Sequence, residues 1–162
     1  MTGFASNVER PPVQVVPSVD LARYAGTWYE IARFPNRFQR KCAGDTSATY
    51  TLRPDGKIEV LNRCRKEDGS ITSAKGTAKK ASQNGPETKL KVTFFWPFYG
   101  DYWIIGLDPD YRWALVGDPG RKYLWILSRE RSMDEGEYAR IVELARHQGF
   151  DVDRLMRTKQ GA

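Results

Sequence analysis

The sequence has little with which to hold a metal ion or cross a membrane. It contains one histidine and two cysteines, and no zinc-ligand spacing surrounds them. It has no apolar run approaching the ~20 residues that span a bilayer as a helix. We therefore expect no metal site and no cofactor.

The chain is also poor in signals for more than one domain. Its 162 residues fit a single domain that can bury its own core. Residues 1–20 contain several prolines and no periodic pattern, so we expect a flexible N-terminal lead before a domain over residues 21–162. The lead has no apolar segment of the signal-peptide type. Either the chain is cytosolic, or an export signal was removed before this numbering begins.

The positive charge is not concentrated anywhere. A net charge of +6 favours anionic partners in general. Lysine and arginine are nevertheless spread along the whole chain, and no run of them forms a basic arm. We interpret the charge as a solvated surface and expect no nucleic-acid partner.

What the sequence has is a series of short segments rich in β-forming residues, separated by Gly, Pro, Asp and Asn turn signals. Connections of hairpin length between such segments predict an antiparallel meander, which can close and so remove its exposed edges. The fold class is therefore all-β, an eight-stranded up-and-down barrel wide enough for side chains or one small ligand. The expected strands are 27–34, 46–52, 57–65, 70–80, 89–96, 102–107, 113–116 and 122–128.

One segment after the strands has helical periodicity. Within residues 134–148, apolar side chains recur at helical spacing, and Gly149 can end the helix. Since all the strands precede it, we expect this helix to pack on the outside of the barrel. Residues 150–156 are expected to add a short closing strand.

Alternation along the strands predicts which side chains line the barrel, because residues two apart share a face. If Trp28 faces inward, Glu30, Ala32 and Phe34 should do so too. Small residues such as Ala48 favour open space, although a filled core would show the same alternation. Tyrosine and asparagine would supply donors to a ligand headgroup or to other side chains of the barrel. The expected ligand-binding set is Phe34, Ala48, Tyr50, Val60, Asn62, Phe94, Tyr102, Ile104, Tyr123 and Trp125.

Glu30 is the one acidic member of the expected lining. An unpaired charge beside aromatic rings is costly, so Glu30 should pair with a lysine or arginine or bond to a tyrosine hydroxyl. No partner acid, base or metal accompanies it in the pattern. We therefore assign no catalytic residue and expect a protein that is not an enzyme.

The two cysteines either are free thiols or form one disulfide. If Arg53 and Lys57 flank the first hairpin turn, Thr46 lies opposite Cys64, and Cys42 is a few residues further along. This geometry favours a Cys42–Cys64 disulfide near one end of the barrel. A disulfide indicates an oxidising compartment.

Three segments resemble the signature motifs of the lipocalin family. Residues 26–32, Gly-Thr-Trp-Tyr-Glu-Ile-Ala, resemble the first-strand signature of Gly-x-Trp followed by an aromatic residue. Asp108 and Arg129 resemble the second and third signatures, in the same order along the chain. The second departs from the family, because Leu107 and Pro109 stand where Thr and Tyr are usual. The resemblance covers roughly residues 19–159 and is closest to the bacterial outer-membrane lipocalins, which are similar to apolipoprotein D.

The resemblance implies a binding protein for a small lipophilic ligand of the fatty acid or lysophospholipid type. It implies a role in bacterial envelope lipid handling, in the periplasm or at the outer membrane. It also implies a structural latch of Gly26, Trp28, Asp108 and Arg129, with the Arg129 guanidinium over the Trp28 indole. The alternatives are an enzyme acting on a lipophilic substrate, such as an isomerase, and a basic nucleic-acid-binding barrel with aromatics on an outer face.

An aromatic stretch over residues 94–99 lies between the fifth and sixth expected strands. Part of it should face outward, and exposed aromatics often mark a contact surface. The alternatives are contact with a membrane surface or a second copy, and packing beneath the late helix. We accordingly expect a monomer or a weak homodimer.

Overall fold

The computed structural model describes residues 10–95 and 98–161. Its helical segments are α2 (Leu21–Tyr24), η1 (Arg37–Gln39), α3 (Glu135–His147) and η2 (Val152–Arg154). Its strands are β1 (Gly26–Arg33), β2 (Gly44–Leu52), β3 (Ile58–Arg65), β4 (Ile71–Lys80), β5 (Lys89–Phe95), β6 (Phe98–Leu107), β7 (Trp113–Gly117), β8 (Leu124–Ser128) and β9 (Met156–Arg157).

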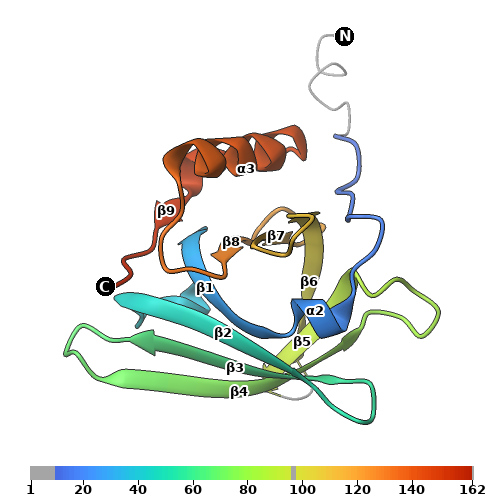
Figure 1. Cartoon of the computed structure of the whole chain (residues 1–162), viewed down its shortest axis with the longest axis horizontal. Helices are drawn as coiled ribbons and strands as arrows, with labels where there is room; N and C mark the ends of the chain where they lie inside the picture. Colours follow the sequence, from blue (N-terminus) through green and yellow to red (C-terminus); the bar gives the residue numbers. More distant parts are fainter. Residues whose placement is uncertain (1–9, 96–97, 162) are drawn as a thin grey trace, which may run out of the picture.

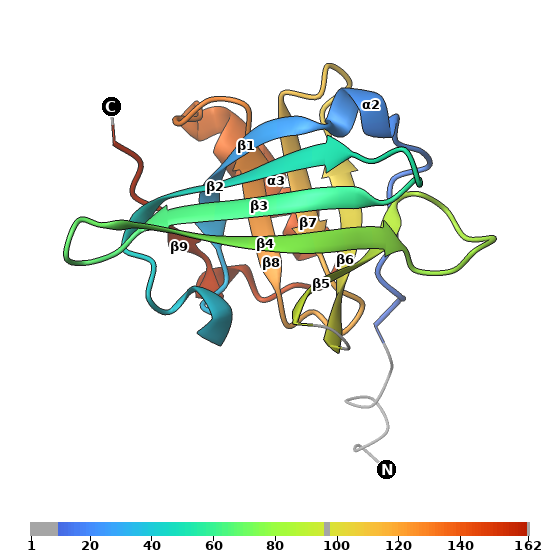
Figure 2. The same ribbon diagram turned by 90° about the horizontal axis from the view of Figure 1, so that it is seen from below.

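The strands form a closed antiparallel barrel. Neighbours run β2-β3-β4-β5-β6-β7-β8-β1-β9, and β1 also pairs with β2, which closes the sheet on itself. From β1 to β8, strands that follow one another in sequence are also neighbours in the sheet, so the topology of the barrel is up-and-down (Figures 1 and 2). The predicted eight-stranded barrel is confirmed.

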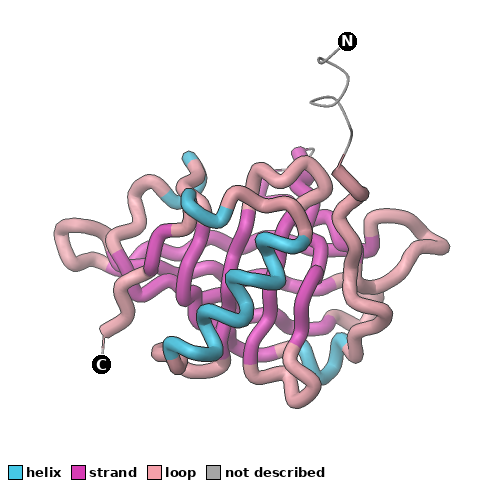
Figure 3. The backbone as a smooth tube through the Cα atoms, turned by 90° about the horizontal axis from the view of Figure 1, so that it is seen from above, coloured by secondary structure: helices cyan, strands magenta, loops and turns pink. Residues whose placement is uncertain are grey.

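The late helix lies outside the barrel, as predicted. Helix α3 begins after Asp134, whose side chain accepts a hydrogen bond from the Glu137 amide at 3.1 Å, as an N-cap does. It crosses the outer face of the sheet (Figure 3) and buries Ile141 and Ala145 there. The core therefore has two layers, one inside the barrel and one between the barrel and α3.

The chain after α3 differs from expectation. Residues 150–156 do not form a strand: Phe150 is buried, η2 follows, and only Met156–Arg157 pairs with β1. Residues 150–155 cover the outer core layer around Phe150. Residues 156–157 then pair with the end of β1 that β2 leaves unpaired. Backbone bonds from Thr158 to Ile31 and from Asp45 to Lys159 continue this closure.

The connection between β5 and β6 is a hairpin rather than a loop. Strand β6 begins at Phe98, earlier than predicted, because Phe95 pairs with Phe98. The tip of the aromatic stretch, residues 96–97, lies outside the described residues.

Residues 10–20, expected to be part of a flexible lead, are packed against the barrel. Val13 and Val19 are buried, and the Val16 amide donates to the Ile104 carbonyl at 3.0 Å. The lead then enters α2, where Asp20 accepts from the amides of Ala22 and Arg23. Four valines, at positions 13, 15, 16 and 19, give this segment apolar surface to bury, and they follow no regular period. Within the described part of the chain, no helix combines the length and apolar character needed to cross a membrane.

Candidate functional site

The two ends of the barrel differ. Because neighbouring strands alternate in direction, α2 and the connections 53–57, 81–88 and 108–112 gather at one end, and the loop containing η1 lies at the other. We call the first end the floor and the second the mouth. On β4 the positions that face the interior change from buried at Ala78, through partly buried at Gly76, to exposed at Ala74. The exposure of interior-facing side chains on this strand therefore increases from the floor towards the mouth.

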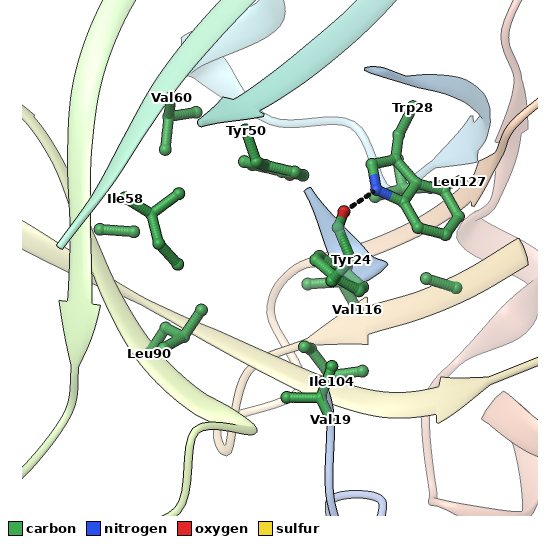
Figure 4. Packing of buried hydrophobic residues seen from close by; sticks show 12 residues of the cluster. Val19, Tyr24, Trp28, Tyr50, Ile58, Val60, Leu90, Ile104, Val116 and Leu127 are labelled. Atoms are coloured by element: carbon green, nitrogen blue, oxygen red, sulfur yellow. Dashed lines mark hydrogen bonds between the residues drawn. The ribbon is translucent and has the colours of Figure 1, made fainter. Parts of the chain in front are cut away.

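Trp28 and Arg129 lie at the floor. The Arg129 guanidinium lies 3.8 Å from the centroid of the Trp28 ring, and Trp28 is fully buried. The indole N–H donates to the carbonyl of Tyr24 at 2.8 Å (Figure 4). Arg129 also donates to the carbonyls of Arg23 at 2.7 Å and Thr27 at 3.1 Å. The pair therefore ties α2 to β1 below the interior.

Gly26 and Asp108 support this end of the barrel. Gly26 has φ +101°, and a Cβ there would lie 3.3 Å from Arg129 Nη1, so a larger residue would be strained and crowded. Asp108 accepts bonds from the amides of Asp110 and Arg112 and from Arg112 Nε. Burial alone would raise the pKa of Asp108, but these donors outweigh it and hold the pKa below its ordinary value. Arg129 joins this loop by donating to the Tyr111 carbonyl at 3.1 Å.

Most of the expected lining residues converge on the inner core layer. Figure 4 shows several of its members pointing toward one another. Tyr50, Val60 and Ile104 are buried there, whereas others are partly exposed and pack against the same cluster; these are Ala48, Phe94, Tyr102 and Trp125. Asn62 pairs directly with Ala48 and is partly exposed. The Tyr123 ring stacks on Trp125 with centroids 5.8 Å apart.

Phe34 does not line the space inside the barrel, which we call the cup. A β-bulge between Glu30 and Ala32 shifts the register of β1 against β8. An inserted residue reverses which face later side chains take. Ala32 and Phe34 therefore belong to the outer layer, where the Phe34 ring lies 6.2 Å from that of Phe150.

The same bulge pairs Glu30 with Arg33. Glu30 is 2% exposed, and its Oε2 accepts from Arg33 Nη1 at 2.8 Å and from the Thr158 hydroxyl. Its Oε1 accepts from Gln39 Nε2 at 2.8 Å, and the Trp125 indole donates to Gln39 Oε1 at 3.0 Å. Both carboxylate oxygens are thus engaged, and Glu30 joins β1 to η1 and the C-terminal segment.

Three tyrosine hydroxyls meet above Trp28. The Tyr102 oxygen lies 2.8 Å from both the Tyr24 and the Tyr50 oxygens. Burial raises the pKa of Tyr50 to about 12 and the pKa of Tyr24 and of Tyr102 well above the ordinary value. All three are therefore protonated at neutral pH. They border a cavity of about 10 Å³, lined by Tyr24, Tyr50, Ile58, Ala78, Leu90, Val92 and Tyr102.

Cys42 and Cys64 form a disulfide, with their Cα atoms 5.5 Å apart. Cys64 is on β3, and Cys42 lies between η1 and β2. The predicted disulfide is confirmed, and it ties the loop at the mouth to the barrel wall.

Two further features of the described residues bear on what the protein could bind. No group of three or more histidine, cysteine, aspartate or glutamate side chains in the described ranges is arranged to hold a metal ion. A hollow of about 310 Å³ lies outside the barrel, between residues 11–14 and α3. Its lining includes Ile105 of the outer layer, so it is separate from the cup.

The sequence did not reveal the partners of two site residues. Tyr24 precedes the first strand, so alternation says nothing about it. Arg33 follows Glu30 by three residues, which ordinary alternation places on opposite faces. The two side chains share a face only because of the bulge, which nothing in the alternation marks.

Comparison with known proteins gives consistent matches. A family model described as a lipocalin-like domain matches residues 19–160. The chain is 46% identical to temperature-induced lipocalin-1 of Arabidopsis thaliana, covering 94% of this chain and 85% of the relative. It is 45% identical to outer membrane lipoprotein Blc of Escherichia coli K12, covering 93% and 85%. Identity to mouse apolipoprotein D is 31%, covering 93% and 80%. Insecticyanin from the tobacco hornworm Manduca sexta superposes with a TM-score of 0.76 at 21% identity, covering 94% and 87%, and supports the fold alone.

Proposed function

The chain belongs to the lipocalin family, and from that premise we propose that it binds and carries a long-chain lipid in its barrel. Lipocalins bind small hydrophobic ligands. The finer proposal is a ligand of the fatty acid or lysophospholipid type, with its hydrocarbon chain in the cup and its headgroup near the mouth.

The observation that carries the proposal is the gradient of exposure inside the barrel. Interior-facing Ala74 is exposed and Gly76 partly buried, while Ala78 is buried at the floor. Phe94 and Trp125 add partly exposed aromatic surface facing the same space. Each methylene that leaves water for such surface contributes ~0.8 kcal/mol, so burial alone can drive binding.

Polar groups near the mouth suit a headgroup. Arg33 and Gln39 lie beside Trp125 there, and the Arg33 Nε is buried without a hydrogen-bond partner among the described residues. Asn62 and Tyr123 add further polar atoms to the lining. An apolar hollow with a few placed donors is the usual form of a small-molecule site.

A matched pair of substitutions on β4 tests the proposal. Ala74→Trp places an indole in the interior, and Lys75→Trp places one on the outer face of the same strand. We expect isothermal titration with palmitic acid and with a lysophosphatidylcholine to show at least tenfold weaker binding for A74W and unchanged binding for K75W. Equal affinities for A74W and the wild type would mean that the chain does not occupy the cup. Failure of the wild type to bind either lipid would refute the proposed function.

We also propose a place in the periplasm or at the outer membrane, in envelope lipid handling. The disulfide is typical of oxidising compartments. Relatives at 45% identity are named outer membrane lipoproteins. Fractionation of the cells that make the protein tests this, since recovery in the cytosol with both thiols free would contradict it. Contact of residues 94–99 with a membrane or a second copy stays a prediction.

A further inference from the structure

The three tyrosine hydroxyls at the floor have one more hydrogen-bond donor than the hydrogen bonds among them require. Three tyrosine hydroxyls carry three protons, but the cluster contains two oxygen–oxygen hydrogen bonds. Whichever oxygen donates in each bond, one proton is left over. Among the described residues, no other side chain or carbonyl forms a hydrogen bond with these three oxygens.

Ionisation of a tyrosine does not remove the surplus proton at neutral pH. Burial holds the pKa of each tyrosine above its ordinary value, so the cluster keeps all its protons at neutral pH. Tyr24 and Tyr50 are buried and Tyr102 is only partly exposed; a donor without an acceptor is unfavourable in such surroundings, and such groups normally have a partner. The structure therefore calls for an acceptor atom beside the cluster.

The cavity beside the tyrosine cluster has the size and the polarity that suit one neutral acceptor atom. The three tyrosines border the cavity of about 10 Å³, which is close to the smallest volume that holds a single water molecule. Every residue that lines this cavity is uncharged. An ionised group would have to lose its water here without a counter-ion, which is far more costly than burying a neutral oxygen.

We propose that the floor of the cup is a subsite for a neutral hydrogen-bond acceptor carried at the buried end of the ligand, such as a ketone, ether or hydroxyl oxygen. This inference rests on the proposed function, because the ligand chain must enter the cup from the mouth. It deepens that function by predicting that the protein prefers lipids oxygenated at the far end of the chain. A lipid ending in a methyl group would leave the surplus proton unpaired or paired with water.

Three ligands and two variants test the subsite. The ligands are palmitic acid, the same chain carrying a methyl ketone at its far end, and the matching dicarboxylic acid; homologous sets of other lengths allow for the depth of the cup. The variant Tyr24→Phe/Tyr50→Phe/Tyr102→Phe keeps all three rings and removes every hydroxyl. Tyr29→Phe is the control, because Tyr29 lies on the outer face beneath Arg131.

We expect the ratio of ketone to methyl affinity to fall about fivefold from the wild type to the triple variant, which corresponds to one net hydrogen bond of about 1 kcal/mol. The ratio should be unchanged in Tyr29→Phe, and the dicarboxylic acid should bind more weakly than the ketone. An unchanged ratio in the triple variant would overturn the subsite and indicate a resident water only. A stronger dicarboxylic acid would overturn the requirement for a neutral group.

The outcomes separate the subsite from the proposed function. If the wild type binds none of the three ligands, the carrier function itself fails. If it binds palmitic acid but shows no dependence on the tyrosines, only the subsite fails. Should the triple variant not fold, a crystal structure of the wild type with the ketone decides: the ketone oxygen must lie within hydrogen-bond distance of a tyrosine oxygen, and any other position refutes the subsite.

Discussion

Replacing Arg129 with alanine should destabilise the protein without changing which lipid it prefers. The guanidinium lies 3.8 Å from the Trp28 ring and donates to the carbonyls of Arg23, Thr27 and Tyr111. A cation–π contact contributes ~0.5–2 kcal/mol. Hydrogen bonds to a charged group contribute ~1.5 kcal/mol or more each, but water can replace part of them at this partly exposed side chain. We expect a loss of about 2–4 kcal/mol in the free energy of unfolding.

Urea denaturation and thermal melting measure this loss. For a domain of this size, about 3 kcal/mol corresponds to a decrease of roughly 6–12 °C in Tm. Arg129→Lys keeps a charge over the ring but lacks the planar fork, so it should fall between alanine and the wild type. Arg131→Ala is the matched control, because its guanidinium lies 5.0 Å from the centroid of the Tyr29 ring on the exposed face and should contribute less than about 1 kcal/mol.

The ligand arm of the experiment separates a latch from a binding residue. Arg129 lies below Trp28, away from the exposed part of the cup, so the affinity ratio of palmitic acid to lysophosphatidylcholine should not change. A loss of stability below about 0.5 kcal/mol would refute the structural role argued from these contacts. Altered lipid preference in a variant of normal stability would refute it as well.

Three further predictions concern the disulfide, the buried ion pair and the tyrosine cluster. Replacing Cys42 and Cys64 by alanine should lower the free energy of unfolding by about 3 kcal/mol, measured in urea; an unchanged value would contradict the chain-entropy argument. Glu30→Gln should cost ~3–5 kcal/mol by leaving Arg33 buried without its counter-ion, and Glu30→Gln/Arg33→Met should cost less; the reverse order in denaturation would disprove the pairing. The pKa of Tyr50, raised to about 12, gives stability that is complete below pH ~10 and lost as the pH rises towards about 12. Tyr50→Phe should therefore lose less stability than the wild type over that interval, by about 2–3 kcal/mol, and identical pH profiles would argue against it.

The parts of the fold that sequence predicts are those set by local pattern. Alternation and turn residues located the strands, and helical spacing located α3. The Cys42–Cys64 disulfide followed from counting along one hairpin, since both cysteines lie at the open ends of its two strands, away from the turn. The barrel could be predicted because most of its connections are short and all its pairings except the closing one, between β1 and β8, join neighbours in sequence.

The parts that sequence misses depend on a single inserted residue or on distant pairing. The bulge in β1 is invisible in the pattern, yet it sends Phe34 to the outer layer and brings Arg33 to Glu30. A short closing strand was expected over residues 150–156, but only Met156–Arg157 pairs with β1, and no local signal marks the bounds of a pairing between segments so far apart in the chain. Tyr24 escaped notice because its position is set by α2, which is too short to show a period.

The most direct test of the carrier proposal is a crystal structure of the protein with palmitic acid bound. We expect a hydrocarbon chain inside the barrel, in contact with Phe94 and Trp125, with its carboxylate towards the mouth. Side chains filling that space, with the lipid bound instead in the outer hollow between residues 11–14 and α3, would contradict it.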